Sequence, residues 1–536
     1  MRRFAFICLA LLALTAAIRA DDAWDKQLAD YKASQKRPSL WKRTQGREAL
    51  ALTRDPRAIP ILAADYKSAE KPRDQVQFLC AALATRYCDT KDCVDALETW
   101  RGAHSRAEDA WLWYRTLRIY ANWRGAEDVK AIIRNPELDV VLRAAALEAI
   151  AARQEAGLLE LVNELLLSLP ADKRRWMLAE SCMSVLTRQP VTDKAFKPPA
   201  EQLARVLDMD TAPEHTKLVI ARGFRRIFNA EHAYMAAAPW LKKLEGDNNR
   251  APSRTLAQPT FLGLQAEGNR ICYVIDLSDS MLTPLTENEK RDLRNPVTGH
   301  RKHDGGDEPA PRPDPDVAAL PWDSITTRFD AAREFLKLSL RKLTTEQYFA
   351  VAAFGTQAAL LEACPGMQQV NEKRIAKAIE ELDAIKPGLV KGKPALRGMT
   401  NLHGGLQRAF QCKSKGLIKS YEYVDWLGFE QGADTIFLLS DGKQSWSDWD
   451  CIDKADDSDV SGDPESGGKL GEKGEHPELH FYGPYVDQRH MLEDIERMNL
   501  FRKAEIHCIG IGEAEEATLR AIAGIGNGQL RLVGRK

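Results

Sequence analysis

Apolar residues in the first half of the chain recur at helical spacing. Residues 141–150 place Val, Leu, Ala and Ile three and four positions apart, which is the spacing of side chains on one face of a helix. A turn at 154–157 and a second apolar stretch at 158–169 follow, and Pro170 comes directly after that stretch. Because proline cannot continue a helix, we predict a pair of helices that ends at this point.

The same plan recurs over residues 21–245, where no strand-like alternation is present. Leu83, Leu117 and Leu147 occupy equivalent positions and lie roughly one helical-repeat length apart. This half resembles HEAT-type helical repeats, which implies an α-solenoid with a long curved surface. The surface has two open interpretations, because it either binds a protein partner or serves as a spacer. The predicted helices are 59–66, 75–87, 92–100, 110–123, 126–133, 141–150, 158–169, 174–186 and 216–228.

The pattern changes after a predicted linker at residues 246–267, which is rich in Gly, Asp, Asn and Pro. Short continuous apolar runs now alternate with helical patterns over residues 268–536. Buried strands that alternate with helices predict a doubly wound, Rossmann-like α/β domain with a mostly parallel sheet. The predicted strands are 271–275, 348–354, 436–439, 506–511 and, at an edge, 529–533. The predicted helices are 329–343, 375–385, 402–410, 491–501 and 517–522.

Two long insertions interrupt this alternation. Residues 282–327 are rich in Pro, Gly, Asp and Lys, and residues 442–488 are rich in Gly, Asp, Glu and Ser. Loops of this length are usually functional or disordered. Both insertions leave the carboxyl ends of predicted strands, which in such a sheet face the ligand. Our hypothesis is that they form a rim that selects a partner.

Oxygen-bearing side chains follow three of the predicted elements. Asp276, Ser278 and Ser280 come directly after the first strand, Thr400 opens a helix, and Asp441 ends the strand at 436–439. One carboxylate and two hydroxyls on a single turn suit a hard cation such as Mg²⁺. The spacing Asp-x-Ser-x-Ser is weak evidence alone, but the later Thr and Asp each stand at the end of a predicted element. The five residues together therefore predict a metal site.

This arrangement closely resembles the metal-ion-dependent adhesion site (MIDAS) of von Willebrand factor A domains. The resemblance implies that Ser278, Ser280 and Thr400 supply hydroxyl ligands, and that Asp276 and Asp441 contact the ion directly or through water. It also implies that an acidic group of a partner completes the coordination. Three of the five ligands are neutral hydroxyls, so we expect an added Asp or Glu carboxylate to be attracted to the ion. Mg²⁺ is the expected ion, with Mn²⁺ or Ca²⁺ as substitutes.

Structural roles for the same residues are the competing interpretation. Asp276 and Asp441 are also helix-capping residues, and Ser278 and Ser280 are common in turns. A fit of all five positions at once favours the metal site. His403 lies near Thr400, and a helix-face histidine with packing or surface duties is a better interpretation than a general base.

The N-terminus has the order of a secretory signal peptide. Arg2 and Arg3 precede an apolar run at residues 4–18, and small residues end at Ala20. The run is shorter than the ~20 residues that span a bilayer. We therefore expect cleavage after Ala20, and a mature protein without a transmembrane segment in the periplasm or outside the cell. The formal net charge of -1 argues against nucleic-acid binding, because no excess of cations is present.

Cysteine and tryptophan positions add structural expectations. One of the ten cysteines lies in the predicted signal peptide, so nine remain and at least one thiol is free or intermolecular. Cys88 and Cys93 are close enough in sequence to pair, whereas Cys272 and Cys508 are expected as core thiols. The four tryptophans of the repeats are expected between repeats in the core. They are Trp100, Trp111, Trp113 and Trp123.

The sequence as a whole favours an exported protein–protein interaction or adhesion module that binds an acidic group of a partner through a divalent cation. No nucleophile–base pair is apparent, so we expect no enzyme activity. Two alternatives stay open at this point. In one, the helical repeats bind the partner and the metal is structural. In the other, the same ion serves a metal-dependent hydrolase.

Overall fold

The computed structural model describes residues 22–37, 40–68, 73–246, 259–295, 314–385, 399–418, 423–441, 444–447, 485 and 487–534. The predicted signal peptide and most of the second insertion lie outside these residues. Helices make up the described part up to residue 246, and a helix-flanked sheet follows from residue 259. We call these two parts the helical arch and the C-terminal domain.

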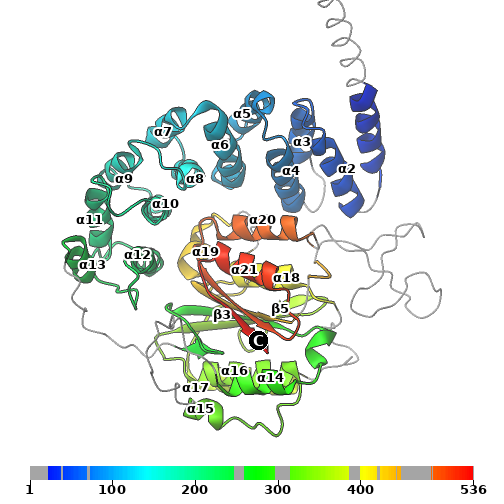
Figure 1. The fold of residues 1–536 in the computed structure, drawn as a ribbon, viewed down its shortest axis with the longest axis vertical. Coiled ribbons are helices and arrows are strands. Elements are labelled where there is room, and N and C mark those ends of the chain that lie inside the picture. The colour runs from blue at the N-terminus through cyan, green and yellow to red at the C-terminus, as the bar shows by residue number, and fades with distance from the viewer. Residues whose placement is uncertain are drawn as a thin grey trace, which may run out of the picture.

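The helical arch is a curved double row of helices that bends around the C-terminal domain (Figure 1). An inner row of α4, α6, α8, α10 and α12 stacks in sequence and faces that domain. The arch comprises a helix at 22–34, α2 Leu40–Leu52, α3 Ala58–Lys67, α4 Arg73–Tyr87, α5 Val94–Gly102, α6 Ala110–Arg124, α7 Glu127–Arg134, α8 Val140–Ile150, α9 Leu158–Leu167, α10 Arg175–Leu186, α11 Lys197–Val206, α12 Glu214–Ile227 and α13 Ala237–Leu244.

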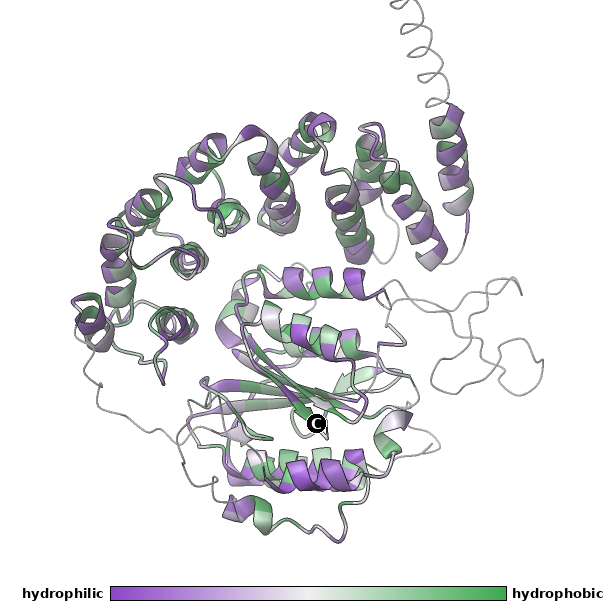
Figure 2. Ribbon diagram, viewed as in Figure 1, coloured by the Kyte–Doolittle hydropathy of each residue, from purple (hydrophilic) through white to green (hydrophobic). Residues whose placement is uncertain are grey.

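Position in the double row explains the composition of each helix. Every residue of α8 is buried, because this inner helix has neighbours on all sides, and its sequence is accordingly apolar except for Arg143 and Glu148. The outer helix α7 buries Val129 and Ile133 and turns its acidic first turn outward. Figure 2 shows this difference as hydrophobic colour on the inward sides and hydrophilic colour on the outer rim. The helix at 22–34 and helices α2, α11 and α13 were not delimited individually by the sequence pattern, although they lie within the stretch predicted to be helical.

The C-terminal domain is built on one mixed, mostly parallel sheet with strand order β5-β4-β3-β7-β8-β9 and β6 beside β4. β3 pairs in parallel with both β4 and β7, while β5 and β6 pair antiparallel with β4. The predicted strands are confirmed, including the edge position of β9. The strands are β3 Arg270–Asp276, β4 Tyr348–Phe354, β5 Ala358–Leu360, β6 Gln368–Gln369, β7 Thr435–Ser440, β8 Glu505–Ile511 and β9 Leu530–Val533, beside a small hairpin of β1 Thr260–Phe261 and β2 Leu264–Gln265.

Helices cover both faces of this sheet, because its central strands are apolar on both sides. Alternate residues of β3 divide between two cores. Ile271, Tyr273 and Ile275 pack toward α16, and Cys272 and Val274 pack toward α18. The side away from the arch carries α14 Glu287–Arg294, α15 Pro315–Ala318, α16 Arg328–Arg341 and α17 Glu372–Ala384. The side toward the arch carries α18 Leu402–Gln411, α19 Trp426–Gln431, α20 Gln488–Asn499 and α21 Glu516–Ile525.

Two expectations need correction. The first insertion contains α14 and α15, and Thr286 and Glu289 form a capping box at the start of α14, so its described part is not a structureless loop. Trp123 is 49% exposed, because it lies in the last turn of α6. Trp100, Trp111 and Trp113 are buried as expected. Cys88 and Cys93, which are close enough in sequence to pair, are free thiols.

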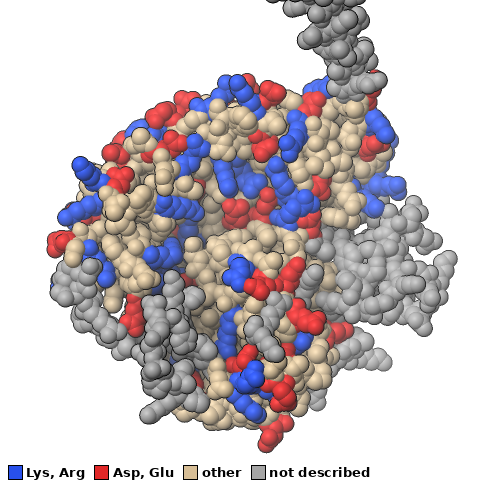
Figure 3. Space-filling view, in the orientation of Figure 1, with Lys and Arg blue, Asp and Glu red and all other residues tan. Residues whose placement is uncertain are grey.

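The concave side of the arch is occupied by the C-terminal domain. Lys503 of the domain reaches Glu148 of α8 at 2.5 Å, and Arg222 of α12 donates to the carbonyl of Asp434 at 2.8 Å. Figure 3 shows cations along the inner edge of the arch, next to carboxylates of the domain. The expected curved surface is therefore not left open. Among the described residues, no helix is both long and apolar enough to cross a bilayer.

Candidate metal site

The carboxyl end of β3 carries the first three predicted ligands. Asp276 is the last residue of the strand and is fully buried. Its Oδ1 accepts the backbone N–H of Ser278 at 2.8 Å, which folds the turn back over the strand end. The hydroxyls of Ser278 and Ser280 are 3.0 Å apart. Asp279, between them, is exposed, as expected for a residue outside the site.

Asp441 joins this turn because β7 lies next to β3. The two strands are parallel, with Ile275 opposite Leu439, so the residues that follow them meet at one edge of the sheet. The Ser280 hydroxyl donates to Asp441 Oδ1 at 2.7 Å. The Ser440 hydroxyl donates to Asp276 Oδ2 at 2.5 Å. Four of the five predicted ligands are thus joined by hydrogen bonds.

Thr400 reaches the same edge from the turn that precedes α18. The next residue, Asn401, donates its backbone N–H to the carbonyl of Gly355, directly after β4, at 2.9 Å. The Thr400 N–H donates to Ser445 Oγ at 2.9 Å, and the Ser445 N–H returns a bond to the Thr400 carbonyl at 3.0 Å. Thr400 is therefore held, fully buried, between the end of β4 and the residues after β7.

Negative charge exceeds positive charge among the buried groups of this edge. Burial, reinforced by the charge of Asp441, raises the pKa of Asp276 to about 7. Burial also raises the pKa of Asp441. Arg328 Nη1 contacts Asp441 Oδ2 at 2.9 Å and Arg328 Nε contacts Glu289 Oε1 at 3.1 Å. If all three carboxylates were ionised, one guanidinium would leave two negative charges unbalanced away from water, and this cost is consistent with the raised pKa values of Asp276 and Asp441.

The donor set fits a hard divalent cation. Two carboxylates and three hydroxyls are oxygen donors, the type that Mg²⁺, Mn²⁺ and Ca²⁺ prefer. Arg328 engages only one oxygen of Asp441, so the Oδ1 side stays directed at Ser280. Across the described residues, three or more His, Cys, Asp or Glu side chains are nowhere gathered as metal ligands. A metal at this edge therefore depends on the hydroxyls.

Sequence reasoning missed four residues that shape the site. Ser440 adjoins a predicted ligand and was visible as a hydroxyl at the strand end. Ser445, Arg328 and Glu289 had no local signal, because their contacts with the site form only across the folded domain. Arg328 is the most informative of them, since it ties the first insertion to Asp441.

A buried histidine lies three residues after Thr400. His403, in the first turn of α18, is fully buried, which agrees with the packing role expected for it. Its Nε2 lies 2.8 Å from Asp494 Oδ2 of α20. Its ring stacks on Tyr485 at 3.9 Å between centroids and 7° between planes. Its backbone N–H donates to Gln444 Oε1 at 2.8 Å.

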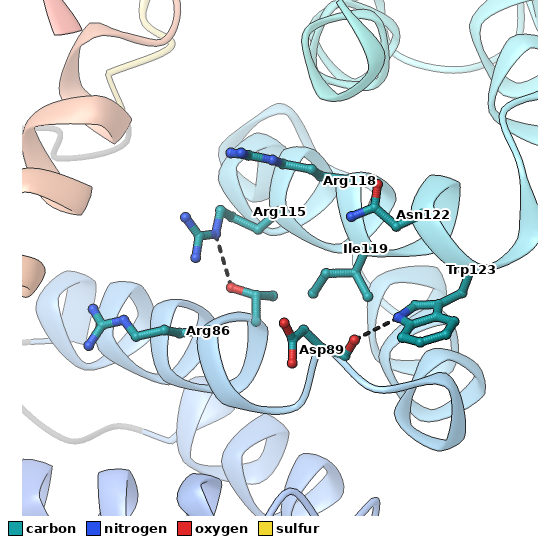
Figure 4. Close-up of a pocket in the computed structure, with 8 residues that line it drawn as sticks. Arg86, Asp89, Arg115, Arg118, Ile119, Asn122 and Trp123 are labelled. Carbon is teal, nitrogen blue, oxygen red and sulfur yellow. Dashed lines mark hydrogen bonds between the residues drawn. The ribbon is translucent and has the colours of Figure 1, made fainter. Parts of the chain in front are cut away.

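A separate pocket of about 470 Å³ lies on the arch between α4 and α6. In Figure 4 the side chains of Arg86, Arg115 and Arg118 point to the same side of it, with Asn122 and Trp123 farther along α6. Arg86 and Arg115 both contact Glu493 of α20. Among the described residues Arg118 has no carboxylate partner, and its Nη1 donates only to the Tyr114 hydroxyl, at 3.5 Å.

Comparison with known families supports the C-terminal assignment. Residues 323–459 and 485–532 match the family model of the von Willebrand factor type A domain. The match includes Thr400 and Asp441 and begins after β3, so it does not reach Asp276, Ser278 and Ser280. No curated protein matched the chain. On the combined basis of this match and the helix-covered, mostly parallel sheet, the C-terminal part of the chain contains a von Willebrand factor type A domain.

Proposed function

We propose that the protein is an exported binding protein that captures a partner through a divalent cation at the carboxyl edge of its sheet. Asp276, Ser278, Ser280, Thr400 and Asp441 would hold the cation. The observation that carries this proposal is the cluster of three buried carboxylates around one guanidinium at that edge, beside three hydroxyls. A bound divalent cation would stabilise the ionised forms of Asp276 and Asp441.

The proposed partner group is a carboxylate. The ion would take an Asp or Glu side chain into its coordination, because a hard divalent cation prefers carboxylate oxygens and three of the five protein donors are hydroxyls. Metal-dependent protein interaction is a common role of domains of this family. We propose a binding role rather than a catalytic one, with Mg²⁺ as the ion and with Mn²⁺ or Ca²⁺ as substitutes.

Mn²⁺ titration of the full chain by calorimetry tests the metal site. Asp276→Ala is expected to weaken Mn²⁺ binding at least about tenfold, because even outer ligand partners contribute that much. Asp279→Ala is the matched control, because it removes an exposed carboxylate from the same turn and should leave binding unchanged. Equal affinity in both variants, or no Mn²⁺ binding to the natural chain, would contradict the proposal.

Partner capture tests the function itself. Immobilised full chain, exposed to the exported proteins of its host, should retain a partner in Mg²⁺ and release it in chelator. The Asp276→Ala variant should retain none. Retention that is equal with and without chelator counts against a metal-bridged partner.

Export is a separate part of the proposal, supported by the signal-like order at the N-terminus. N-terminal sequencing of the protein from the exported fraction is expected to begin at Asp21. Recovery only from the cytoplasm, with Met1 retained, would show that the segment is not a cleaved signal.

The pocket on the arch favours a second candidate function, in which the repeats bind the partner. Among the described residues Arg118 pairs with no carboxylate, and the exposed ring of Trp123 lines the same pocket, a combination suited to an acidic segment with one apolar side chain. In this case capture would survive chelator and Asp276→Ala, and it would be lost in Arg118→Glu. The capture experiment above therefore separates the two functions.

A further inference from the structure

We infer that the helical arch controls the metal site, because α20 connects the arch to the turn that carries Thr400. In this inference His403 and Asp494 are positioning residues for Thr400, and the docking of the arch and the binding of the metal stabilise each other. The inference rests on the proposed metal-binding function and adds its regulation.

The first connection consists of the ion pairs and the hydrogen bond between the arch and α20. Glu493 receives Arg86 Nη2 at 2.5 Å and Arg115 Nη2 at 3.0 Å. One turn on, Glu496 accepts the hydroxyl of Tyr114 at 2.7 Å. The Glu493 side chain is only 16% exposed, so these charge-assisted bonds are partly shielded from water and are stronger than surface ion pairs.

The second connection is made by Asp494, the residue that follows Glu493 in α20. Asp494 points to the other side of the helix and is fully buried. Burial opposes its charge, but Arg497 and His403 outweigh burial and hold the pKa of Asp494 at about 2. The carboxylate accepts Arg497 Nε at 2.6 Å and lies 2.8 Å from His403 Nε2. An ionised carboxylate only accepts hydrogen bonds, so His403 Nε2 carries the proton.

The third connection leads from His403 to the site. His403 follows Thr400 by three residues, in the first turn of α18. Its backbone N–H binds Gln444, and Ser445, the next residue, holds both backbone groups of Thr400. A displacement of the His403 ring therefore acts on the segment whose hydrogen bonds place the Thr400 hydroxyl.

Tyr485 provides a second, independent contact between His403 and the arch. The Tyr485 ring stacks on His403 and also on Phe78 of α4, at 6.0 Å between centroids. The guanidinium of Arg497 lies 5.0 Å over the same Phe78 ring. His403 thus has two supports, Asp494 and Tyr485, and the arch contacts both of them. Because Glu493 and Asp494 are adjacent residues of α20, we expect release of Glu493 by the arch to disturb the contacts of Asp494.

This arrangement makes a reciprocal prediction. If arch docking favours the Thr400 position that binds metal, bound metal must favour arch docking to the same extent. The double variant Arg86→Ala/Arg115→Ala removes both ion pairs between the arch and Glu493. Arg124→Ala is the matched control, because it removes an exposed arginine of the same helix α6 whose carboxylate partner, Asp95, also belongs to the arch.

The test is Mn²⁺ titration of the full chain together with hydrogen exchange of α4, α6 and α20. The double variant is expected to bind Mn²⁺ at least about fivefold more weakly, whereas Arg124→Ala binds normally. In the natural chain, Mn²⁺ is expected to slow exchange in α20 and in the facing turns of α4 and α6. Normal Mn²⁺ affinity in the double variant, with loosened α20, would overturn the inference.

Substitutions at the positioning residue distinguish coupling from general stability. His403→Gln keeps a donor toward Asp494 and should retain more Mn²⁺ affinity than His403→Ala, with α4 exchange following the same order. Equal Mn²⁺ affinity of the two variants would show that the His403 side chain does not connect α20 to the metal site. If the natural chain binds no Mn²⁺, the proposed function fails. If it binds and all of these variants bind equally, only the present inference fails.

Discussion

Asp276 carries a charge that the fold without metal stabilises poorly. The side chain is fully buried, and its hydrogen bonds from Ser278 and Ser440 do not offset burial and the nearby charge of Asp441. An asparagine has the same shape. It can accept from the Ser278 N–H and donate to the Ser440 hydroxyl, which rotates. The substitution Asp276→Asn therefore removes the charge of the side chain and keeps its shape, so the effect of the charge can be measured alone.

Asp276→Asn is accordingly expected to stabilise the protein in chelator while it abolishes Mn²⁺ binding. Removal of one of two excess negative charges should raise the free energy of unfolding by about 1–3 kcal/mol. Urea denaturation of both proteins in chelator and in Mn²⁺ measures this. Destabilisation by a similar amount in both conditions would show that the carboxylate is needed for packing alone.

The candidate site illustrates how far single residues can be predicted. Asp276, Ser278, Ser280 and Asp441 were predicted from oxygen donors at strand ends, and adjacency of β3 and β7 brings them together. Arg328 could not be predicted, because its two ion pairs join elements that are remote in sequence. Local pattern identifies donors, whereas the partners that set their charge balance come from packing.

At the scale of elements, α18 is positioned by its close approach to the sheet. Gly405 permits this approach, since a Cβ there would lie 2.6 Å from Phe354 Cδ1 and 2.9 Å from Val274 Cγ1. Both of those side chains are fully buried in the sheet and cannot move aside. Gly524 of α21 is the opposite case, because its Cβ would meet nothing within 4 Å.

The two glycines predict opposite effects of one substitution. Gly405→Ala should lower the free energy of unfolding by about 1–3 kcal/mol through overpacking, although alanine is the better helix former. Gly524→Ala should raise it by roughly 0.5–1 kcal/mol from helix propensity alone. Urea denaturation of the two variants under one condition checks both. A stabilising Gly405→Ala would mean that α18 is not tightly packed on the sheet.

At the scale of the whole molecule, the arch and the domain are joined by buried charges as well as by apolar packing. Glu505, at the start of β8, meets Arg225 at 2.8 Å and Arg222 at 3.4 Å, both from α12. Burial favours the neutral acid, but Arg222, His507 and Arg225 outweigh burial and hold the pKa of Glu505 well below its usual range. A carboxyl with a lowered pKa stabilises the folded state only while it is ionised.

The arch–domain contact is therefore expected to weaken in acid. The contribution of Glu505 is complete above its unfolded pKa of about 4.3 and is lost as the pH falls from there through the lower folded value. Hydrogen exchange of α12 and β8 in the full chain, followed from neutral pH downward, measures the loss. Glu505→Gln should remove this component of the pH dependence. An unchanged acid profile in that variant would assign the loss to other groups.

The sequence by itself determined the class of each half and the donors of the candidate site. Helical spacing and short apolar runs depend on which face of an element is buried, and that information is local. Tertiary structure alone decided that the arch encloses the domain, that Arg328 balances Asp441, and that His403 lies between the site and α20. These relations join residues far apart in the chain. No local pattern encodes them, because each depends on the charge and shape of a partner that only folding brings close.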